Sequence, residues 1–178
     1  FRYQSKKTLN YNKITLYYHV YMKNHWREIV TEQIGLLKKS GLYHKCERMV
    51  VGCVGAQEDT KSLMKILGSS KYEVHYWGEE GFEQPTLRLL ADKTKDGIVC
   101  YFHTKGASKL ADNVKEWRDE MNEHVLLRWR DCVAYLKQGY DTAGVNWCEN
   151  KGGLKNYYEG NFWWATSDYI KGLQPVKE

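Results

Sequence analysis

The amino-acid sequence predicts an α/β fold with a mainly parallel central sheet that is flanked by helices on both faces. The main observation is that short runs rich in β-branched and aromatic residues alternate with longer amphipathic stretches. In addition, 178 residues are enough for one domain with a sizeable core. The chain is 42% hydrophobic and 28% charged, as is usual for globular proteins.

The first four segments form two strand–helix pairs. Residues 14–21 (ITLYYHVY) favour a strand, because β-branched and aromatic side chains pack well on a sheet. In residues 25–39 the apolar side chains recur at helical spacing, and Gly41 follows as a helix terminator. The short apolar run at 49–54 predicts a buried strand, and residues 58–67 predict an amphipathic helix.

The same alternation continues through the middle of the chain. Residues 72–77 alternate as a third strand, Pro85 opens the next helix, and residues 98–102 form the fourth strand. Two further helices are expected at 114–121 and 124–136. The last third contains short aromatic runs separated by glycines, which predict short strands.

Composition and missing motifs exclude several classes of protein. The net charge is +5, from 27 basic and 22 acidic residues, but the basic residues are scattered, so we expect no nucleic-acid partner. The five cysteines form no C-x-x-C pair and predict reduced thiols in a cytoplasmic protein. No apolar stretch is long enough to span a bilayer, so any membrane contact is expected at the periphery. The P-loop, G-x-G-x-x-G, G-x-S-x-G and H-E-x-x-H motifs are all missing.

Polar side chains stand where the predicted parallel strands end. The segment VCYFHTKGAS ends the fourth strand with an imidazole, a hydroxyl and an ammonium before a glycine. Ligands collect at the carboxyl ends of strands in such sheets, so these exits are the candidate site. The candidate ligand-binding residues at the strand exits are His19, Tyr21, Gly55, His103, Thr104 and Lys105.

Seven segments, which cover nearly the whole chain, form a pattern when they are read in order: YYHVYMKNHWREIVTEQIGLLKKSGLY, VVGCVG, EQPTLRLL, YFHTKGAS, EWRDEM, YDTAGVNW and EGNFWWATSDYIKGL. In this order they resemble a family of glycosyltransferases from bacterial polysaccharide loci and large DNA viruses, related to the rhamnan-synthesis transferases. The family pattern has a strand ending in HTK, a following W-R and a later G-x-x-F-W. The resemblance implies a GT-A-like fold. It also implies inverting transfer of rhamnose or another hexose from a nucleoside diphosphate sugar to a glycan hydroxyl.

The chain departs from most GT-A enzymes at the fourth strand. Those enzymes hold Mn²⁺ or Mg²⁺ there with a D-x-D motif, and this sequence contains none. The diphosphate leaving group still needs its developing negative charge neutralised. We expect Lys105 and Arg118 to do this directly, as catalytic and donor-binding residues. A divalent metal ligated by His103 is the alternative.

The resemblance also implies the other donor and acceptor contacts. Glu83 and Thr86 lie close to the nucleotide in the family, although both could simply cap the helix that follows them. Asn161 belongs to the implied acceptor side. Of Trp163 and Trp164, strand alternation would bury one and leave the other free to stack on an acceptor sugar.

An inverting transfer needs a carboxylate to accept the proton of the attacking hydroxyl. Asp168, just past the G-N-F-W-W strand, is our first candidate for this base, and Asp141 is the second. A group beyond Glu178 is the third.

We expect a single transferase domain over residues 1–178, with a nucleotide-sugar part at 1–110 and an acceptor part at 111–178. The chain starts without Met and stops soon after a helix-like segment, as expected of a fragment truncated at its C-terminus. A non-catalytic carbohydrate-binding module is the alternative, because 14 Tyr, 7 Trp and 4 Phe supply rings for stacking on sugars. A nucleic-acid binder would use the same rings and the positive charge.

Overall fold

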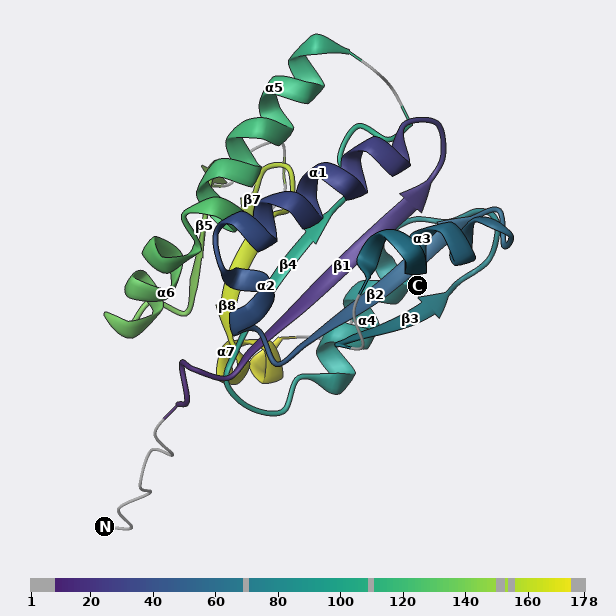
Figure 1. Ribbon diagram of the computed structural model, residues 1–178. Coiled ribbons are helices and arrows are strands. Elements are labelled where there is room, and N and C mark those ends of the chain that lie inside the picture. Colours follow the sequence, from purple (N-terminus) through teal and green to yellow (C-terminus); the bar gives the residue numbers. More distant parts are fainter. Residues whose placement is uncertain (1–8, 69–70, 109–110, 150–152, 154–155, 174–178) are drawn as a thin grey trace, which may run out of the picture.

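The central feature of the fold is a mixed sheet, seen in a computed structural model that describes residues 9–68, 71–108, 111–149, 153 and 156–173 (Figure 1). Within these residues, six strands pair in the order β3-β2-β1-β4-β8-β5. Strands β1 to β4 are parallel, β8 is antiparallel to β4, and β5 is antiparallel to β8. The bounds are β1 Ile14–Met22, β2 Arg48–Gly55, β3 Tyr72–Tyr76, β4 Ile98–His103, β5 Thr142–Gly144 and β8 Trp163–Thr166.

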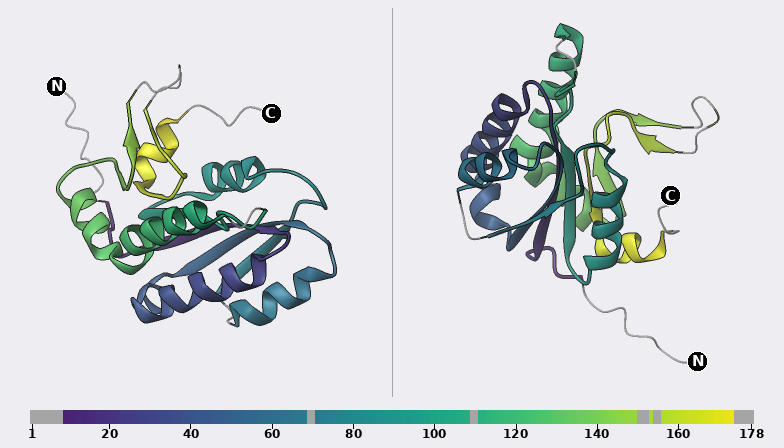
Figure 2. Two further views of the ribbon diagram at one scale, coloured as in Figure 1. Left: turned by 90° about the horizontal axis from the view of Figure 1, so that it is seen from above. Right: turned by 90° about the vertical axis from the view of Figure 1, so that its right-hand side faces the viewer.

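Helices cover both faces of this sheet, as the two side views show (Figure 2). The helices are α1 Trp26–Lys39, α2 Leu42–Lys45, α3 Asp59–Leu67, α4 Gln84–Lys93, α5 Asp112–Met121, α6 Trp129–Lys137 and α7 Ser167–Gly172, with a π-helix, η1, at Asn122–Leu127. Helices α1, α3 and α6 pack with η1 on one face, and α4 and α7 pack on the other. The predicted α/β class, with its mainly parallel sheet and two layers of helices, is confirmed.

The two cores follow from the alternation of side chains along the strands. Leu16, Tyr18 and Val20 of β1 point into the larger core under α1 and α3. Tyr17 points to the opposite side, where it packs with Leu90 of α4. A central parallel strand that is covered on both faces is apolar at most positions, which explains why Thr15 and His19 are the only residues in ITLYYHVY that are neither aliphatic nor aromatic hydrophobic.

The C-terminal part of the chain completes the same sheet. Strands β8 and β5 come from the part expected to form the acceptor side, and they join the strands that come from residues 1–110. A separate hairpin of β6 (Trp147–Cys148) and β7 (Tyr157–Tyr158) projects from the body of the molecule (Figure 2). No helix in the described part of the chain is both long and apolar enough to cross a membrane.

The helix predicted at 124–136 differs from the observed one. The chain forms η1 directly after α5, and α6 starts only at Trp129. In η1 the backbone N–H of Arg128 donates to the carbonyl of Glu123, five residues earlier, at 2.9 Å. This wider turn accompanies the burial of the Asn122 side chain, which an uninterrupted amphipathic pattern would not predict.

A buried glutamine of α1 connects this helix to the end of β4. Gln33 is 0% exposed and accepts a hydrogen bond from the Tyr18 hydroxyl at 2.6 Å. Its amide nitrogen donates to the carbonyl of His103 at 3.2 Å and to Oδ1 of Asn122 at 3.1 Å. Buried polar groups are stable only when they are paired, so Gln33 fixes three elements relative to one another.

Replacing Gln33 by Leu should lower the free energy of unfolding by roughly 1–3 kcal/mol for each polar group left unpaired. The substitution keeps the approximate size of the side chain but removes the partner of the Tyr18 hydroxyl. Urea denaturation followed by circular dichroism measures the change. Gln57→Leu, the same substitution at an exposed position, is the control and should change stability by less than about 0.5 kcal/mol. Equal effects at the two positions would contradict the role given to Gln33.

Candidate functional site

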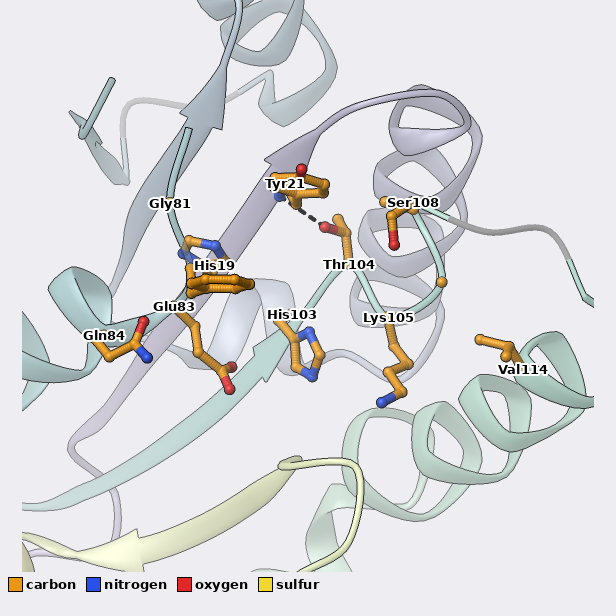
Figure 3. Close-up of a pocket in the computed structure, with 13 residues that line it drawn as sticks. His19, Tyr21, Gly81, Glu83, Gln84, His103, Thr104, Lys105, Ser108 and Val114 are labelled. Carbon is orange, nitrogen blue, oxygen red and sulfur yellow. Dashed lines mark hydrogen bonds between the residues drawn. The ribbon is translucent and has the colours of Figure 1, made fainter. Parts of the chain in front are cut away.

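A pocket of about 480 Å³ opens at the carboxyl ends of β1 and β4 (Figure 3). The chain leaves β1 toward β2 and β3 and then returns to β4 on the other side of β1. Such a reversal of strand order creates the crevice in which α/β sheets bind ligands. Among the residues that line the pocket are six of the predicted donor-binding residues: His19, Tyr21, Glu83, His103, Thr104 and Lys105.

Thr104 holds the two strand ends together. Its backbone N–H donates to the carbonyl of His19 at 3.1 Å, and its hydroxyl accepts from the backbone N–H of Tyr21 at 2.8 Å. The side chain is buried, so its hydroxyl continues the β1–β4 pairing where the backbone ladder stops. Thr104 therefore sets the position at which the chain turns away toward Lys105.

Glu83 enters the pocket from the residue before α4. One carboxylate oxygen accepts from the Tyr101 hydroxyl at 2.6 Å, and the other accepts from the Asn161 amide at 3.0 Å. The Asn161 carbonyl oxygen in turn accepts from the indole N–H of Trp163 at 2.8 Å. The rings of Tyr101 and Trp163 stack with centroids 5.4 Å apart. The carboxylate is thus held in one orientation by residues of β4 and of the segment leading into β8.

Two imidazoles lie next to each other in the pocket, because His19 and His103 are register partners in β1 and β4. Burial, with a smaller contribution from neighbouring His103, lowers the pKa of His19 to about 4, and Glu83 opposes this only in part. Burial also lowers the pKa of His103, again with Glu83 acting in the opposite direction. Both rings are therefore uncharged at neutral pH.

The orientation of each imidazole is fixed by one hydrogen bond. Nδ1 of His19 lies 2.8 Å from the Thr86 hydroxyl. Nε2 of His103 donates to the carbonyl of Gly160 at 2.9 Å. Gly160 has a φ of 89°, a conformation that favours glycine, and a Cβ there would lie 2.3 Å from Sδ of Met121, so the Met121 side chain would have to shift.

Lys105 is the one lysine or arginine among the described residues that line the pocket. Its ammonium lies 4.1 Å from the centroid of the Trp117 ring, a cation–π contact that holds the flexible chain against α5. In Figure 3 the side chain extends from the loop after β4 into the space beside His103. A point charge in this position suits an anionic group of a ligand.

Arg118 lies behind the loop that carries Lys105 and does not line the pocket. Its guanidinium is buried, with 5% of the residue exposed. It donates to the carbonyl of Lys105 at 3.0 Å and pairs with Glu32 at 3.3 Å. We expected Arg118 to contact a phosphate directly. The buried guanidinium instead positions the loop that carries Lys105.

The described residues that line the pocket do not form a set of three or more protein ligands for a metal ion. His103, the expected ligand, already uses Nε2 in its bond to Gly160. Among the described residues, no three His, Cys, Asp or Glu side chains come together in an arrangement that could hold a metal.

Two other expected donor contacts lie beside the pocket rather than in its lining. Thr86 is fully buried and supports His19 from α4. A Cβ on Gly52 would lie 1.9 Å from the Thr86 hydroxyl oxygen, which explains why a glycine interrupts β2 there. Gly55 ends β2, where its carbonyl accepts from the Tyr76 hydroxyl at 2.9 Å.

The structure does not bring the two aspartates proposed as bases to the pocket. Strand β8 runs antiparallel to β4, so the chain reaches Asp168 at the amino end of β4, where the N–H of Ser167 donates to the carbonyl of Gly97 at 2.9 Å. The Asp168 side chain is 71% exposed and faces Lys171 at 3.8 Å. Asp141 precedes β5 and lies at the same edge, where its carbonyl accepts from the N–H of Thr166 at 3.0 Å. Both carboxylates are thus at the edge of the sheet opposite the pocket.

The tryptophan pair alternates as expected, but Trp164 cannot contact an acceptor. Trp164 is 0% exposed, and its indole N–H donates to the carbonyl of Val125 at 2.9 Å inside the larger core. Trp163 is partly exposed on the other face and supports Asn161. Of the three expected acceptor residues, only Trp163 and Asn161 belong to the Glu83 network.

Several residues of the site were not predicted from the sequence. Phe82 and Gln84 flank Glu83 and line the pocket, and Phe82 is 78% exposed. Because they are the sequence neighbours of Glu83, which was a predicted donor-binding residue, they could have been predicted as pocket residues too. Gln33 was visible as a polar residue in the apolar stripe of α1, but nothing in that pattern showed that its partner would be the carbonyl of His103.

Comparisons with known proteins place this chain in a family. One similar solved structure is 4-diphosphocytidyl-2C-methyl-D-erythritolsynthase from Anaerococcus prevotii DSM 20548, with a TM-score of 0.49, 8% identity, and coverage of 92% of this chain and 74% of that chain. Another is the Mycobacterium tuberculosis rv0371c homolog from mycobacterium sp. strain JC1, with a TM-score of 0.42, 11% identity, and coverage of 94% and 78%. No curated protein matches the sequence significantly. Residues 17–178 match the model of the family described as a domain of unknown function (DUF8361), and the chain therefore belongs to this family.

Proposed function

We propose that this protein is a glycosyltransferase that binds a nucleoside diphosphate sugar in the pocket and transfers rhamnose or another hexose to a glycan hydroxyl. The observation that carries the proposal is the gathering of six predicted donor-binding residues around one pocket, at the point where the strand order reverses. The resemblance of seven sequence segments to transferases of polysaccharide synthesis supplies the reaction. A sheet that combines strands from both parts of the chain also suits a GT-A-like fold.

In this proposal Lys105 binds the diphosphate. The two histidines are uncharged at neutral pH, which leaves the ammonium of Lys105 as the cation that faces the ligand among the described lining residues. Charge builds up on the diphosphate as the bond to the sugar breaks, so a fixed cation stabilises the transition state more than the ground state. Arg118 contributes indirectly, because it holds the carbonyl of Lys105.

The acceptor is proposed to approach from the side of Trp163 and Asn161, and the transfer is proposed to invert the anomeric centre. Trp163 is partly exposed, and an indole face suits the apolar face of a sugar. Asp168 and Asp141 are set aside as bases because they lie at the far edge of the sheet. Among the described residues that line the pocket, Glu83 is the one with an acidic side chain.

A thermal-shift screen tests the proposed function. Wild-type protein is mixed with UDP, GDP or dTDP, or with UDP-glucose, GDP-mannose or dTDP-rhamnose, each with and without Mn²⁺. A transferase is stabilised by at least one nucleotide and its sugar conjugate, because a ligand of the folded state raises the melting temperature. Stabilisation by free glycans alone would instead favour the carbohydrate-binding module. Stabilisation by oligonucleotides with a strong salt dependence would favour a nucleic-acid binder.

Lys105→Ala should weaken binding of the diphosphate by roughly tenfold to a hundredfold, because one charge-assisted contact to phosphate contributes about 1.5–3 kcal/mol. The melting temperature of the unliganded protein should stay nearly unchanged, since the side chain is partly exposed in a loop. Isothermal titration calorimetry with the best nucleotide measures the affinity. Lys65→Ala, at an exposed lysine of α3 outside the pocket, is the matched control. If Lys105→Ala binds the nucleotide as tightly as wild type, and a chelator abolishes binding, a metal ion rather than Lys105 neutralises the diphosphate.

Arg118→Met should behave differently from Lys105→Ala. Methionine keeps much of the packing volume but leaves the carbonyl of Lys105 without its donor, so we expect a loss of about 1–3 kcal/mol in the free energy of unfolding. Nucleotide affinity should also fall, because the loop loses its support. Denaturation curves and calorimetry on the same samples separate the two effects. A loss of affinity equal to that of Lys105→Ala, with unchanged stability, would mean that Arg118 contacts the phosphate directly.

A further inference from the structure

The Glu83 carboxylate is turned toward the pocket and away from the helix that it precedes. Glu83 is the residue before the first turn of α4, where a carboxylate can interact with the helix dipole and with the free backbone N–H groups. Here the side chain makes no capping hydrogen bond. It reaches Tyr101 and Asn161 instead, and it lines the pocket. The local role expected for an acidic residue at a helix start therefore does not explain its orientation.

The partners of Glu83 leave part of its hydrogen-bonding capacity open toward the pocket. An ionised carboxylate has about four acceptor sites. Tyr101 donates to one oxygen and Asn161 to the other, which accounts for two of them. The remaining sites call for donors, such as the hydroxyl groups of a ligand. A phosphate offers no donor when ionised and would be repelled by the carboxylate.

The pocket thus has two ends of different character. Figure 3 shows Glu83 and Lys105 entering from opposite sides of His103. The Lys105 end carries a cation, whereas the Glu83 end carries an anion beside the imidazoles of His19 and His103. Uncharged imidazoles can hydrogen-bond to hydroxyls but attract a phosphate only weakly. A ligand with a diphosphate and a polyhydroxyl group suits this pocket with the diphosphate toward Lys105 and the hydroxyl groups toward Glu83.

We infer that Glu83 binds hydroxyl groups of the sugar that is transferred, while Lys105 binds the diphosphate. The inference rests on the proposed function and adds the orientation of the donor in the pocket. Asn161 and Trp163 are then positioning residues: the indole N–H fixes the Asn161 amide so that its nitrogen donates to Glu83. Such a supporting set of hydrogen bonds keeps a binding group in place before the ligand arrives.

The test compares nucleoside diphosphates with their sugar conjugates in Glu83→Gln. Calorimetry measures the affinity of wild type and variant for UDP and UDP-glucose, GDP and GDP-mannose, and dTDP and dTDP-rhamnose. In wild type the conjugate should bind more tightly than the free diphosphate. We call the ratio of the affinity for the conjugate to the affinity for the free diphosphate the sugar-dependent gain. Glu83→Gln should reduce this ratio by roughly tenfold or more, because hydrogen bonds to charged groups are stronger than those to neutral groups. The affinity for the free diphosphate should change by less than about threefold.

Two further variants control for folding and for indirect effects. Glutamine keeps the size of Glu83 and can still accept from Tyr101, so the fold should survive, and the melting temperature checks this. Glu80→Gln changes an exposed acid outside the pocket and should leave every affinity unchanged. Trp163→Phe removes the support of Asn161 and should reduce the sugar-dependent gain in the same direction, and by less than Glu83→Gln.

The possible outcomes separate this inference from the proposed function. Equal weakening of the free diphosphate and its conjugate in Glu83→Gln would place the ribose rather than the transferred sugar on Glu83 and overturn the inference. If Glu83→Gln leaves the sugar-dependent gain unchanged, the inference is also overturned, but the proposed function stands as long as the protein binds nucleotides. If wild type binds none of the nucleotides, the proposed function fails and the inference fails with it.

Discussion

The pairing of β1 with β4 is the constraint on which the rest of the site depends. These two strands lie at the centre of the sheet and run in register from Ile14 and Ile98 to His19 and His103. The hydroxyl of Thr104 extends the pairing one step further, to the backbone of Tyr21. Because parallel strands end at the same edge, this register delivers two imidazoles and the Lys105 loop to one pocket. A slip of one residue would turn each of these side chains to the opposite face.

Burial gives the pocket its electrostatic character. The pKa of His19 falls to about 4 mainly because the ring is shielded from water, and the nearby His103 ring adds to the effect. Lys105 lies at the edge of the pocket, with its ammonium against the face of Trp117. Lys105 and the Glu83 carboxylate lie on opposite sides of His103, and tertiary packing produces this separation. In the proposed complex, the cation binds the anionic group of the ligand and the carboxylate binds its hydroxyl groups.

A second set of polar groups supports the loop after β4 from within the protein. Gln33 donates to the carbonyl of His103, and Arg118 donates to the carbonyl of Lys105. Asn122, Gln33 and Glu32 connect these contacts through further hydrogen bonds. Buried polar networks specify one arrangement, because a displaced member leaves its partners unpaired at a cost. The π-helix that carries Asn122 belongs to this network, as is common for such helices near functional sites.

The sequence by itself determined the α/β class, the approximate bounds of the first four strands, and five residues of the pocket lining, because hydrophobic periodicity and strand exits are local signals. The sixth, Glu83, was implied by the family resemblance. The sequence also indicated that one of Trp163 and Trp164 would be buried, but the tertiary structure decided which one. Only the antiparallel insertion of β8 places Asp168 at the far edge of the sheet, and strand direction is not encoded in the pattern of a single strand. The partners of Glu83 and Arg118 come from segments far away in the chain, so their roles follow from packing rather than from spacing.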